Sequence, residues 1–308
     1  MPNNYYVGFD IGGTKCAVVL GETNGERLPV IVARASFLTS ENPTPAQCLH
    51  RLSQQTQQLL DVNNLKSTFI KAGGISCGGP LNSAAGVILS PPNLPGWDNV
   101  PVVDMLKSTF PFPIHLQNDA NAGALAEWKW GAAVGTQTAV FLTFGTGLGA
   151  GLIINGRLHV GRNDFAGEVG HWRLAPDGPI GFGKRGSFEG FCSGAGIQQL
   201  AAQHFQNIDI KTLAKKARAG DAKAREVFTL SGEKLGEGLA LIIDLLNPEV
   251  IVLGSIFVRC EDLIRTAMEI ALQRETLSTA LQNCRVVPAQ LSEQIGDYAA
   301  LAVAMELY

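Results

Sequence analysis

Two glycine-rich turns follow short apolar runs and contain residue types that bind phosphate. The first consists of Asp10, Ile11, Gly12, Gly13, Thr14 and Lys15. Glycines in such a turn leave backbone N–H groups open to an anion, and Lys15 adds a positive charge. Asp10 is a candidate for holding Mg²⁺ through bound water, because this ion prefers oxygen ligands and keeps its waters. The motif is not a Walker A loop, and a plain hairpin turn is the alternative interpretation.

The second turn consists of Gly145, Thr146, Gly147, Leu148 and Gly149. Its glycine spacing differs from GxGxxG and a strand is predicted after it, which argues against an NAD-dependent dehydrogenase. A second phosphate-binding hairpin fits better, and the two turns together suit the two sides of a triphosphate. Gly254, after a predicted strand, is a further candidate at which an adenine could approach closely. Close helix packing explains that glycine equally well.

Asn118 and Asp119 stand where a predicted strand passes directly into a helix. Phosphoryl transfer needs little covalent chemistry from a protein, so one positioned carboxylate can act as the base for an attacking hydroxyl. Asp119 is the candidate for this role, and Asn118 is a candidate for binding neighbouring sugar hydroxyls. Since Asp is also a favoured helix N-cap, a purely structural Asp119 is the alternative.

Sugar hydroxyls need both hydrogen-bond donors and acceptors, and four more residues can supply them. Glu168 and His171 lie three residues apart in a Gly-Glu-Val-Gly-His segment, and Glu189 stands at a predicted helix start. Asn93 lies in a Pro- and Gly-rich loop with Trp97. The alternative for Glu168 and His171 is a surface turn. For Glu189 it is a charge that interacts with the helix dipole. For Asn93 it is a rigid loop around a packed Trp97.

The apolar pattern predicts an α/β protein with a repeated unit. Strands are expected at residues 5–11, 16–20, 30–38, 69–77, 113–117, 138–144, 150–154, 250–253 and near 285–287, and helices at 45–62, 102–110, 120–131 and 292–307. The order strand, glycine turn, strand of residues 7–20 returns at 141–154, which suggests two related domains. We expect a smaller N-terminal α/β domain of residues 1–117 plus 293–308 and a larger C-terminal α/β domain of residues 118–292.

Composition narrows the class of protein. The length of 308 residues suits two domains, and the net charge of −3 argues against a nucleic-acid partner. Apolar runs such as residues 239–246 are too short to span a bilayer, so no membrane partner is expected. The start has no signal-peptide pattern, and the six cysteines are scattered, which favours reduced thiols and a cytoplasmic location.

Five motifs in this order resemble those of the ROK family of sugar kinases and repressors, over the range from Val7 to Leu307. They are Asp-x-Gly-Gly-Thr-Lys, Asn-Leu-Pro-Gly-Trp, Asn-Asp-Ala-Asn, Phe-Gly-Thr-Gly-x-Gly and Gly-Glu-x-Gly-His. The resemblance implies an actin-like ATPase (ribonuclease H-like) fold with two α/β domains around a cleft. It implies ATP at the two glycine hairpins and sugar bound by Asn118, Asp119, Glu168, His171 and Glu189. It also implies that Asp119 is the catalytic base. Members of the family are commonly dimers or tetramers, and we expect a homodimer.

The sequence departs from the family pattern at a metal site. Many members bind a structural zinc with the histidine that matches His171 and with three cysteines. Those three positions hold Ile180, Phe182 and Ser187 here. Because a structural zinc needs about four ligands, we predict no zinc. The family's repressors carry an N-terminal helix-turn-helix, and the four residues before the first predicted strand leave no room for one, which favours the enzyme branch.

The function expected from these residues is a hexokinase-type reaction with ATP and Mg²⁺. The γ-phosphate passes to the 6-hydroxyl of a hexose, with glucose as first choice and an N-acetylhexosamine or fructose as the alternative. A non-catalytic sugar-binding sensor on the same fold is the alternative from another class. The presence of Asp10, Asp119 and Glu168 argues against that sensor, since a protein without catalysis need not keep them.

Overall fold

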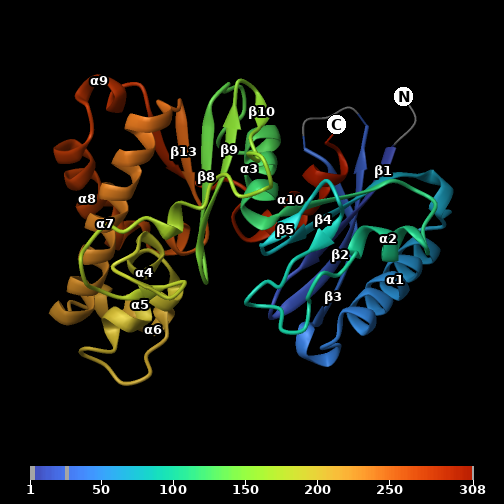
Figure 1. Cartoon of the computed structure of the whole chain (residues 1–308), viewed down its shortest axis with the longest axis horizontal. Coiled ribbons are helices and arrows are strands. Elements are labelled where there is room, and N and C mark those ends of the chain that lie inside the picture. The colour runs from blue at the N-terminus through green and yellow to red at the C-terminus, as the bar shows by residue number, and fades with distance from the viewer. Residues whose placement is uncertain (1–3, 25–27, 307–308) are drawn as a thin grey trace. The chain divides into compact units, whose positions relative to one another are not determined.

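The computed structural model describes residues 4–24 and 28–306 and divides the chain into two compact α/β units. The first unit contains the described residues up to Val134, together with Val160–Ala166 and the stretch from Glu293 onward. The second unit contains Gly135–His159 and Gly167–Ser292. Figure 1 shows a sheet with flanking helices in each.

The first unit is built on a five-stranded sheet in the order β3-β2-β1-β4-β7. β1, β2 and β3 pair antiparallel, whereas β4 and β7 add in parallel beside β1. The elements of this unit are β1 (Asn4–Ile11), β2 (Lys15–Thr23), β3 (Val30–Leu38), α1 (Pro45–Val62), β4 (Ile70–Cys77), the short pair β5 (Leu81–Asn82) and β6 (Val87–Ile88), α2 (Val102–Lys107), β7 (Ile114–Asn118), α3 (Asp119–Trp130) and α10 (Ile295–Ala304).

The two faces of this sheet are covered by different helices, because successive strand residues point to opposite sides. Val7 and Phe9 belong to the apolar cluster that α1 also joins through Leu52. On the opposite face, a Cβ at Gly8 would lie 2.9 Å from the Cβ of Ala300, so glycine lets α10 approach closely. Figure 1 shows α1 and α10 on opposite sides of this sheet.

The second unit repeats this topology with the strand order β10-β9-β8-β13-β14. β8, β9 and β10 are antiparallel, and β13 and β14 add in parallel beside β8, as β4 and β7 do beside β1. The repeat expected from residues 7–20 and 141–154 is therefore confirmed. The strands of this unit are β8 (Ala139–Phe144), β9 (Leu148–Ile154), β10 (Arg157–Leu158), β11 (Ile180–Gly181), β12 (Lys184–Arg185), β13 (Val250–Leu253) and β14 (Arg285–Pro288).

Helices make up much of the rest of the second unit. They are α4 (Phe188–Phe191), α5 (Gly194–Ala201), α6 (Ile210–Arg218), α7 (Ala222–Leu246), α8 (Ile256–Glu275) and α9 (Ser278–Leu281). Gly232 and Gly236 let α7 lie directly on α8, since a Cβ at Gly236 would stand 2.4 Å from the carbonyl oxygen of Met268. Gly236 thus serves close helix packing.

Local sequence signals account for several element boundaries. Pro45 is the first residue of α1, and the Thr44 side chain forms a capping box with Gln47. Among the described residues, four short 3₁₀ segments lie between the longer elements, two of them being η1 (Thr39–Glu41) and η3 (Val169–His171). In the described parts of the chain, no helix has the length and apolarity that crossing a membrane requires.

The division into units differs from the domain boundary expected at Asn118. α3 is counted with the first unit, and the second unit begins at Gly135. The physical reason is that α3 packs on α10, for example through the rings of Trp130 and Tyr298, whose centroids are 6.1 Å apart. A second difference is the short stretch Val160–Ala166, which returns to the first unit, where Asp164 accepts hydrogen bonds from Ser83.

Candidate functional site

Candidate residues of the first unit meet at one edge of its sheet. β1, β4 and β7 are parallel, and their registers pair Ile11 with Cys77 and Cys77 with Asn118. The carboxyl ends of the three strands therefore lie side by side, which is where ligands bind in open α/β sheets. This edge brings together Asp10, the turn that follows it, and Asn118 with Asp119.

The first glycine hairpin is held from outside by Thr39. The hairpin closes with a hydrogen bond of 3.1 Å from the amide of Gly12 to the carbonyl of Lys15. The Thr39 hydroxyl donates to the carbonyl of Gly12 at 2.6 Å, and its amide donates to the carbonyl of Thr14 at 3.0 Å. Gly13, Thr14 and Lys15 are exposed. The hairpin is thus fixed in shape and open to a ligand.

Asn93 lies against this hairpin. A Cβ at Gly13 would lie 2.4 Å from the carbonyl oxygen of Asn93, and one at Gly78, after β4, would lie 3.1 Å from its side-chain nitrogen. The loop is held by Trp97, which is 1% exposed. Trp97 is thus packed, as the alternative interpretation of this loop had it, and the same packing places the exposed Asn93 beside the first glycine hairpin.

Asp10 has the most perturbed carboxyl group of the first unit. The pKa of Asp10 is raised to about 6, first by burial and then by the negative charges of Asp297 and Asp119, against the opposing charges of Arg34 and Lys15. Asp297 is itself paired with Arg34, whose Nε lies 2.7 Å from its Oδ2. The site therefore holds more negative charge than its own cations balance.

That excess of negative charge fits a cation at Asp10. Among residues 4–24 and 28–306, no three His, Cys, Asp or Glu side chains group in a way that could hold a metal ion directly. A Mg²⁺ ion that keeps most of its water shell does not require such a group. Asp10 therefore suits an ion held through water rather than one held in a cage of side chains.

Asn118, and not Asp119, caps the helix that follows β7. The Asn118 side chain accepts a hydrogen bond of 2.7 Å from the amide of Asn121, and Asp119 is the first residue of α3. The Asp119 side chain is exposed and also accepts from the amide of Ala120 at 2.8 Å. The alternative of Asp119 as the N-cap is therefore wrong, because its neighbour has taken that position.

The second glycine hairpin stands at the corresponding edge of the second unit. The amide of Gly145 donates to the carbonyl of Gly147 at 3.1 Å, and the amide of Gly149 donates to the Thr143 hydroxyl at 3.0 Å. Gly254 follows β13, the parallel neighbour of β8, and its amide donates to the carbonyl of Leu142 at 3.0 Å. The five candidate residues for ATP in this unit, Gly145, Thr146, Gly147, Gly149 and Gly254, share this edge.

Two glycines set the path of the segment that carries Glu168 and His171. A Cβ at Gly167, whose φ is +91°, would lie 2.0 Å from the carbonyl oxygen of Ala150, and one at Gly170 would lie 2.4 Å from that of Leu148. Only glycine lets the segment run this close to β9. The spacing of these glycines around Glu168 is thus a packing requirement.

Glu168, His171 and Glu189 lie near one another in the second unit. Burial raises the pKa of Glu168, His171 lowers it and the charge of Glu189 raises it again. Glu189 also accepts a hydrogen bond of 3.0 Å from the amide of Leu148. Glu189 therefore links this cluster to the second glycine hairpin, a role that its position at a helix start did not indicate.

The short hairpin of β11 and β12 packs on the same cluster. The ring centroid of Phe182 lies 4.6 Å from that of His171, and the Lys184 ammonium donates to the backbone carbonyl of His171 at 2.6 Å. A Cβ at Gly181 would lie 2.8 Å from the Cβ of Glu189. The positions at which the family has zinc-binding cysteines are here part of an aromatic and hydrogen-bonded contact.

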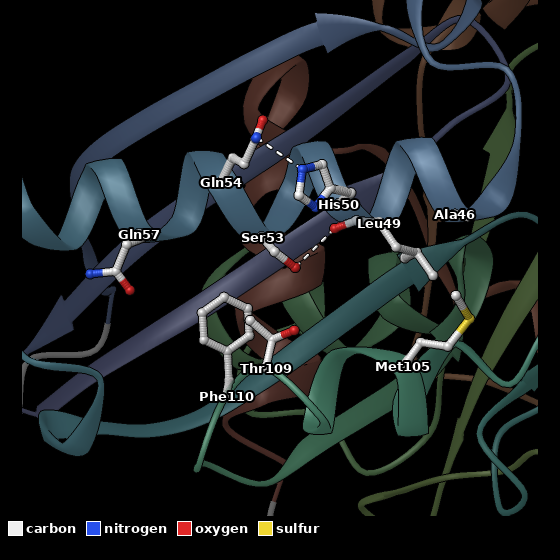
Figure 2. Close-up of a pocket in the computed structure, with 9 residues that line it drawn as sticks. All are labelled: Ala46, Leu49, His50, Ser53, Gln54, Gln57, Met105, Thr109 and Phe110. Carbon is white, nitrogen blue, oxygen red and sulfur yellow. Dashed lines mark hydrogen bonds between the residues drawn. The ribbon is translucent and has the colours of Figure 1, made fainter.

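A hollow of about 420 Å³ lies elsewhere in the first unit (Figure 2). It runs along α1 between His50 and Ser53 on one side and Met105 and Phe110 on the other. The His50 ring is hydrogen-bonded to Gln54, and the Ser53 hydroxyl donates to the carbonyl of Leu49. None of the candidate residues lines it, so it lies apart from the candidate site.

Sequence reasoning did not single out four residues that shape the site. They are Thr39, Asp297, Lys184 and, as a ring contact of His171, Phe182. Each acts through a tertiary contact rather than a contact with its sequence neighbours, and no local motif marks such contacts. The sequence comes nearest to marking these contacts at Gly167 and Gly170, two glycines that pack directly against another backbone.

The comparisons with known proteins give the family. A sequence model described as the ROK family matches residues 6–306. The chain belongs to the ROK family. A glucokinase of Halalkalibacterium halodurans is 30% identical over 271 residues, covering 82% of this chain and 81% of the relative. An N-acetylmannosamine kinase of Yersinia pestis is 32% identical, with 80% of each chain covered. The Escherichia coli transcriptional regulator NagC is 29% identical, and the alignment covers 83% of this chain and 66% of NagC.

Solved structures of this family share the fold. A ROK hexokinase from Thermus thermophilus superposes with a TM-score of 0.82 at 28% identity, and 98% of each chain is covered. A ROK glucokinase from Streptomyces griseus, in complex with glucose and AMPPNP, gives a TM-score of 0.77 at 27% identity over 98% of this chain and 99% of that one. The ROK protein described here therefore has the two-domain actin-like ATPase fold that its motifs predicted.

Proposed function

We propose that this ROK protein, a sugar kinase, transfers the γ-phosphate of MgATP to the 6-hydroxyl of a hexose, with glucose as the first substrate. The observation that carries the proposal is the exposed carboxylate of Asp119 on the sheet edge that bears the first glycine hairpin. Its charge is close enough to raise the pKa of Asp10. A base beside a phosphate-binding turn is what transfer to a hydroxyl requires.

Each proposed role follows from a local feature. Asp119 accepts the proton of the attacking hydroxyl, whose oxygen forms a bond to the γ-phosphorus of ATP. The bond from that phosphorus to the β,γ-bridging oxygen breaks, and ADP leaves. Asn118, its side-chain oxygen engaged with α3, holds the end of β7 in place beside the sugar. The exposed amides of Gly13 and Thr14 and the ammonium of Lys15 bind phosphate oxygens. These groups are preorganised, which is how electrostatic stabilisation lowers a barrier.

Asp10 would hold Mg²⁺ through water, and the ion would supply positive charge to offset the charge that develops on the phosphate oxygens. In the second unit, Gly145, Thr146, Gly147, Gly149 and Gly254 are proposed for the nucleotide. Glu168, His171 and Glu189 are proposed for sugar hydroxyls, together with Asn93 of the first unit. Carboxylates accept and the imidazole either donates or accepts, so the set matches a polyol.

Three sugars are candidates for the substrate. Glucose is preferred because both a glucokinase and a glucose-bound structure are among the similar proteins. An N-acetylhexosamine is the second candidate, supported by the similarity to an N-acetylmannosamine kinase. Fructose is the third. These sugars differ in single substituents, so pocket shape rather than the motif residues decides between them.

A non-catalytic sugar sensor is the alternative function, favoured by the similarity to the regulator NagC. Against it, Asp119 is exposed at the strand end and Asp10 carries a carboxyl group whose raised pKa lowers stability at neutral pH. A protein that only binds sugar gains nothing from that cost. We also propose that the protein works without zinc and forms a homodimer, to be checked by metal analysis and by light scattering.

The test is ADP release by the purified protein with MgATP and a panel of glucose, mannose, fructose, allose, N-acetylglucosamine and N-acetylmannosamine. We expect turnover on one of them and a fall in kcat of about 10² to 10⁴ in Asp119→Asn, the usual range for loss of a general base. Asp104→Asn, an exposed carboxylate on α2, is the matched control. Binding of sugar without turnover on any of the six would instead support the sensor.

A further inference from the structure

The turn between β11 and β12 has an unusual residue for its shape. β11 pairs Gly181 with Lys184 of β12, so Phe182 and Gly183 form a two-residue turn. Both have positive φ, +50° and +74°. Turns of this kind prefer Asn-Gly, because a bulky side chain is disfavoured at positive φ. The chain follows that preference between β9 and β10, where Asn155 and Gly156 have φ of +53° and +68°.

Burial does not explain the choice of Phe182. The side chain is 59% exposed, so it gains little from removal of apolar surface from water. A residue that breaks a local preference without a packing gain is expected where function requires it. The ring contact that the structure shows for Phe182 is with His171, at 4.6 Å between centroids and an interplanar angle of 59°.

Other residues of the β11–β12 hairpin contact His171 and its neighbour Glu189. The Lys184 ammonium donates to the backbone carbonyl of His171 at 2.6 Å. Gly181 lies so close to Glu189 that a Cβ there would be 2.8 Å from the Glu189 Cβ. The hairpin itself is fixed from behind, since the Gln199 side chain bonds both the amide and the carbonyl of Ile180. The hairpin thus touches two of the three proposed sugar ligands of the second unit.

We infer that Phe182 is a positioning residue that sets the orientation of the His171 imidazole toward the sugar, with Lys184 fixing the backbone of His171. This inference rests on the proposed function, in which His171 binds a sugar hydroxyl. The ring of Phe182 limits rotation of the imidazole from one side, and the backbone hydrogen bond limits movement of its Cα. A ligand group held in one orientation loses less freedom on binding and gives tighter binding.

The test replaces Phe182 by the residue that the turn prefers. Phe182→Asn removes the ring and keeps the backbone shape, as Asn155 shows within the same chain. We expect the KM for the sugar to rise about tenfold, the KM for ATP to stay within about twofold, and the melting temperature to stay equal or rise. Phe182→Tyr keeps the ring and is expected to stay close to wild type on all three.

The matched control is Ile180→Thr. Ile180 is 40% exposed in the same hairpin, and its contacts with Gln199 are made by its backbone, so the substitution removes apolar surface from the hairpin while the Phe182 ring stays in place. Threonine keeps the branched shape that strands favour. We expect wild-type KM values for this variant. An equal rise in sugar KM in Ile180→Thr and Phe182→Asn would show a general effect of the hairpin and would overturn the inference.

A second readout does not depend on catalysis. A neighbouring aromatic ring shifts the proton resonances of the His171 imidazole, which is identified among the five histidines by its loss in His171→Gln. We expect these resonances to move in Phe182→Asn and to stay in Phe182→Tyr and Ile180→Thr. Absence of turnover in the wild type on every sugar would refute the proposed function alone. Unmoved His171 resonances in Phe182→Asn would refute the positioning role whatever the turnover.

Discussion

Asp10→Asn is expected to stabilise the unliganded protein at neutral pH while removing its activity. The Asp10 carboxyl is buried beside the charges of Asp297 and Asp119, and the pKa of Asp10 is raised from its ordinary 3.8 to about 6. A carboxylate kept charged in such a place lowers stability. Asparagine has nearly the same shape and no charge, so it removes the cost but cannot hold Mg²⁺ as a carboxylate does.

The size of the effect follows from the shift. A folded-state pKa above the unfolded value means that the native state binds more protons, so the free energy of unfolding falls as pH rises between 3.8 and about 6. At 1.36 kcal/mol per pKa unit, the shift lowers that free energy by about 3 kcal/mol at pH 7. At pH 4.5 the same linkage lowers the free energy of unfolding by only about 1 kcal/mol.

Urea unfolding at pH 7 and pH 4.5, without nucleotide and with EDTA present, measures this difference. We expect the free energy of unfolding of Asp10→Asn to exceed that of wild type by about 3 kcal/mol at pH 7 and by about 1 kcal/mol at pH 4.5. Glu41→Gln, which removes an exposed carboxylate, should change stability by no more than about 0.5 kcal/mol at either pH. Adding MgATP should stabilise wild type and not the variant.

Two results would refute this reasoning. A gain in Asp10→Asn that is the same at both pH values would show that packing, and not the charge of Asp10, is responsible. A loss of stability at pH 7 would show that the carboxylate is compensated by its neighbours, with Arg34 outweighing Asp297 and Asp119. In either case the cation site would lose its electrostatic support.

Three further substitutions test other contacts. Glu189→Gln weakens a charged hydrogen bond to the amide of Leu148, so steady-state kinetics should show the KM for ATP rising with that for sugar, each by about tenfold. Gly74→Ala places a Cβ 2.2 Å from the amide of Ala304, and urea unfolding should show a loss of about 3 kcal/mol, against none for Gly79→Ala, which has open space. Thr143→Asp should raise the KM for MgATP about tenfold, whereas neutral Thr143→Asn should not.

The elements of this fold were predictable where local chemistry marks them. Pro45 with its Thr44 cap begins α1 as expected, and the Asn155-Gly156 turn joins β9 to β10. The duplicated topology was visible because strand, glycine turn and strand recur in both halves. Local signals of this kind act over a few residues, so a single sequence displays them directly.

The candidate site was predictable only as a set of residue types. The motifs name Asp10 and Glu168, but the pKa of each depends on charges that the fold brings near: Asp297 for the first and Glu189 for the second. Nothing in the sequence around Thr39 shows that its hydroxyl holds the first glycine hairpin. Such contacts join segments that are far apart in the chain. A single sequence taken by itself carries no signal for them.

The two hairpins are alike in backbone but differ in the residue two positions before their first glycine. In the first unit this residue is Asp10, whose carboxylate lies in an environment rich in negative charge. In the second it is Thr143, whose hydroxyl accepts the amide of Gly149 and so closes its own hairpin. A neutral hydroxyl adds no repulsion to a triphosphate, whereas a second buried carboxylate would. The repeated topology therefore supplies two similar glycine turns, and under the proposed function the difference at this position leaves the cation to the turn after Asp10.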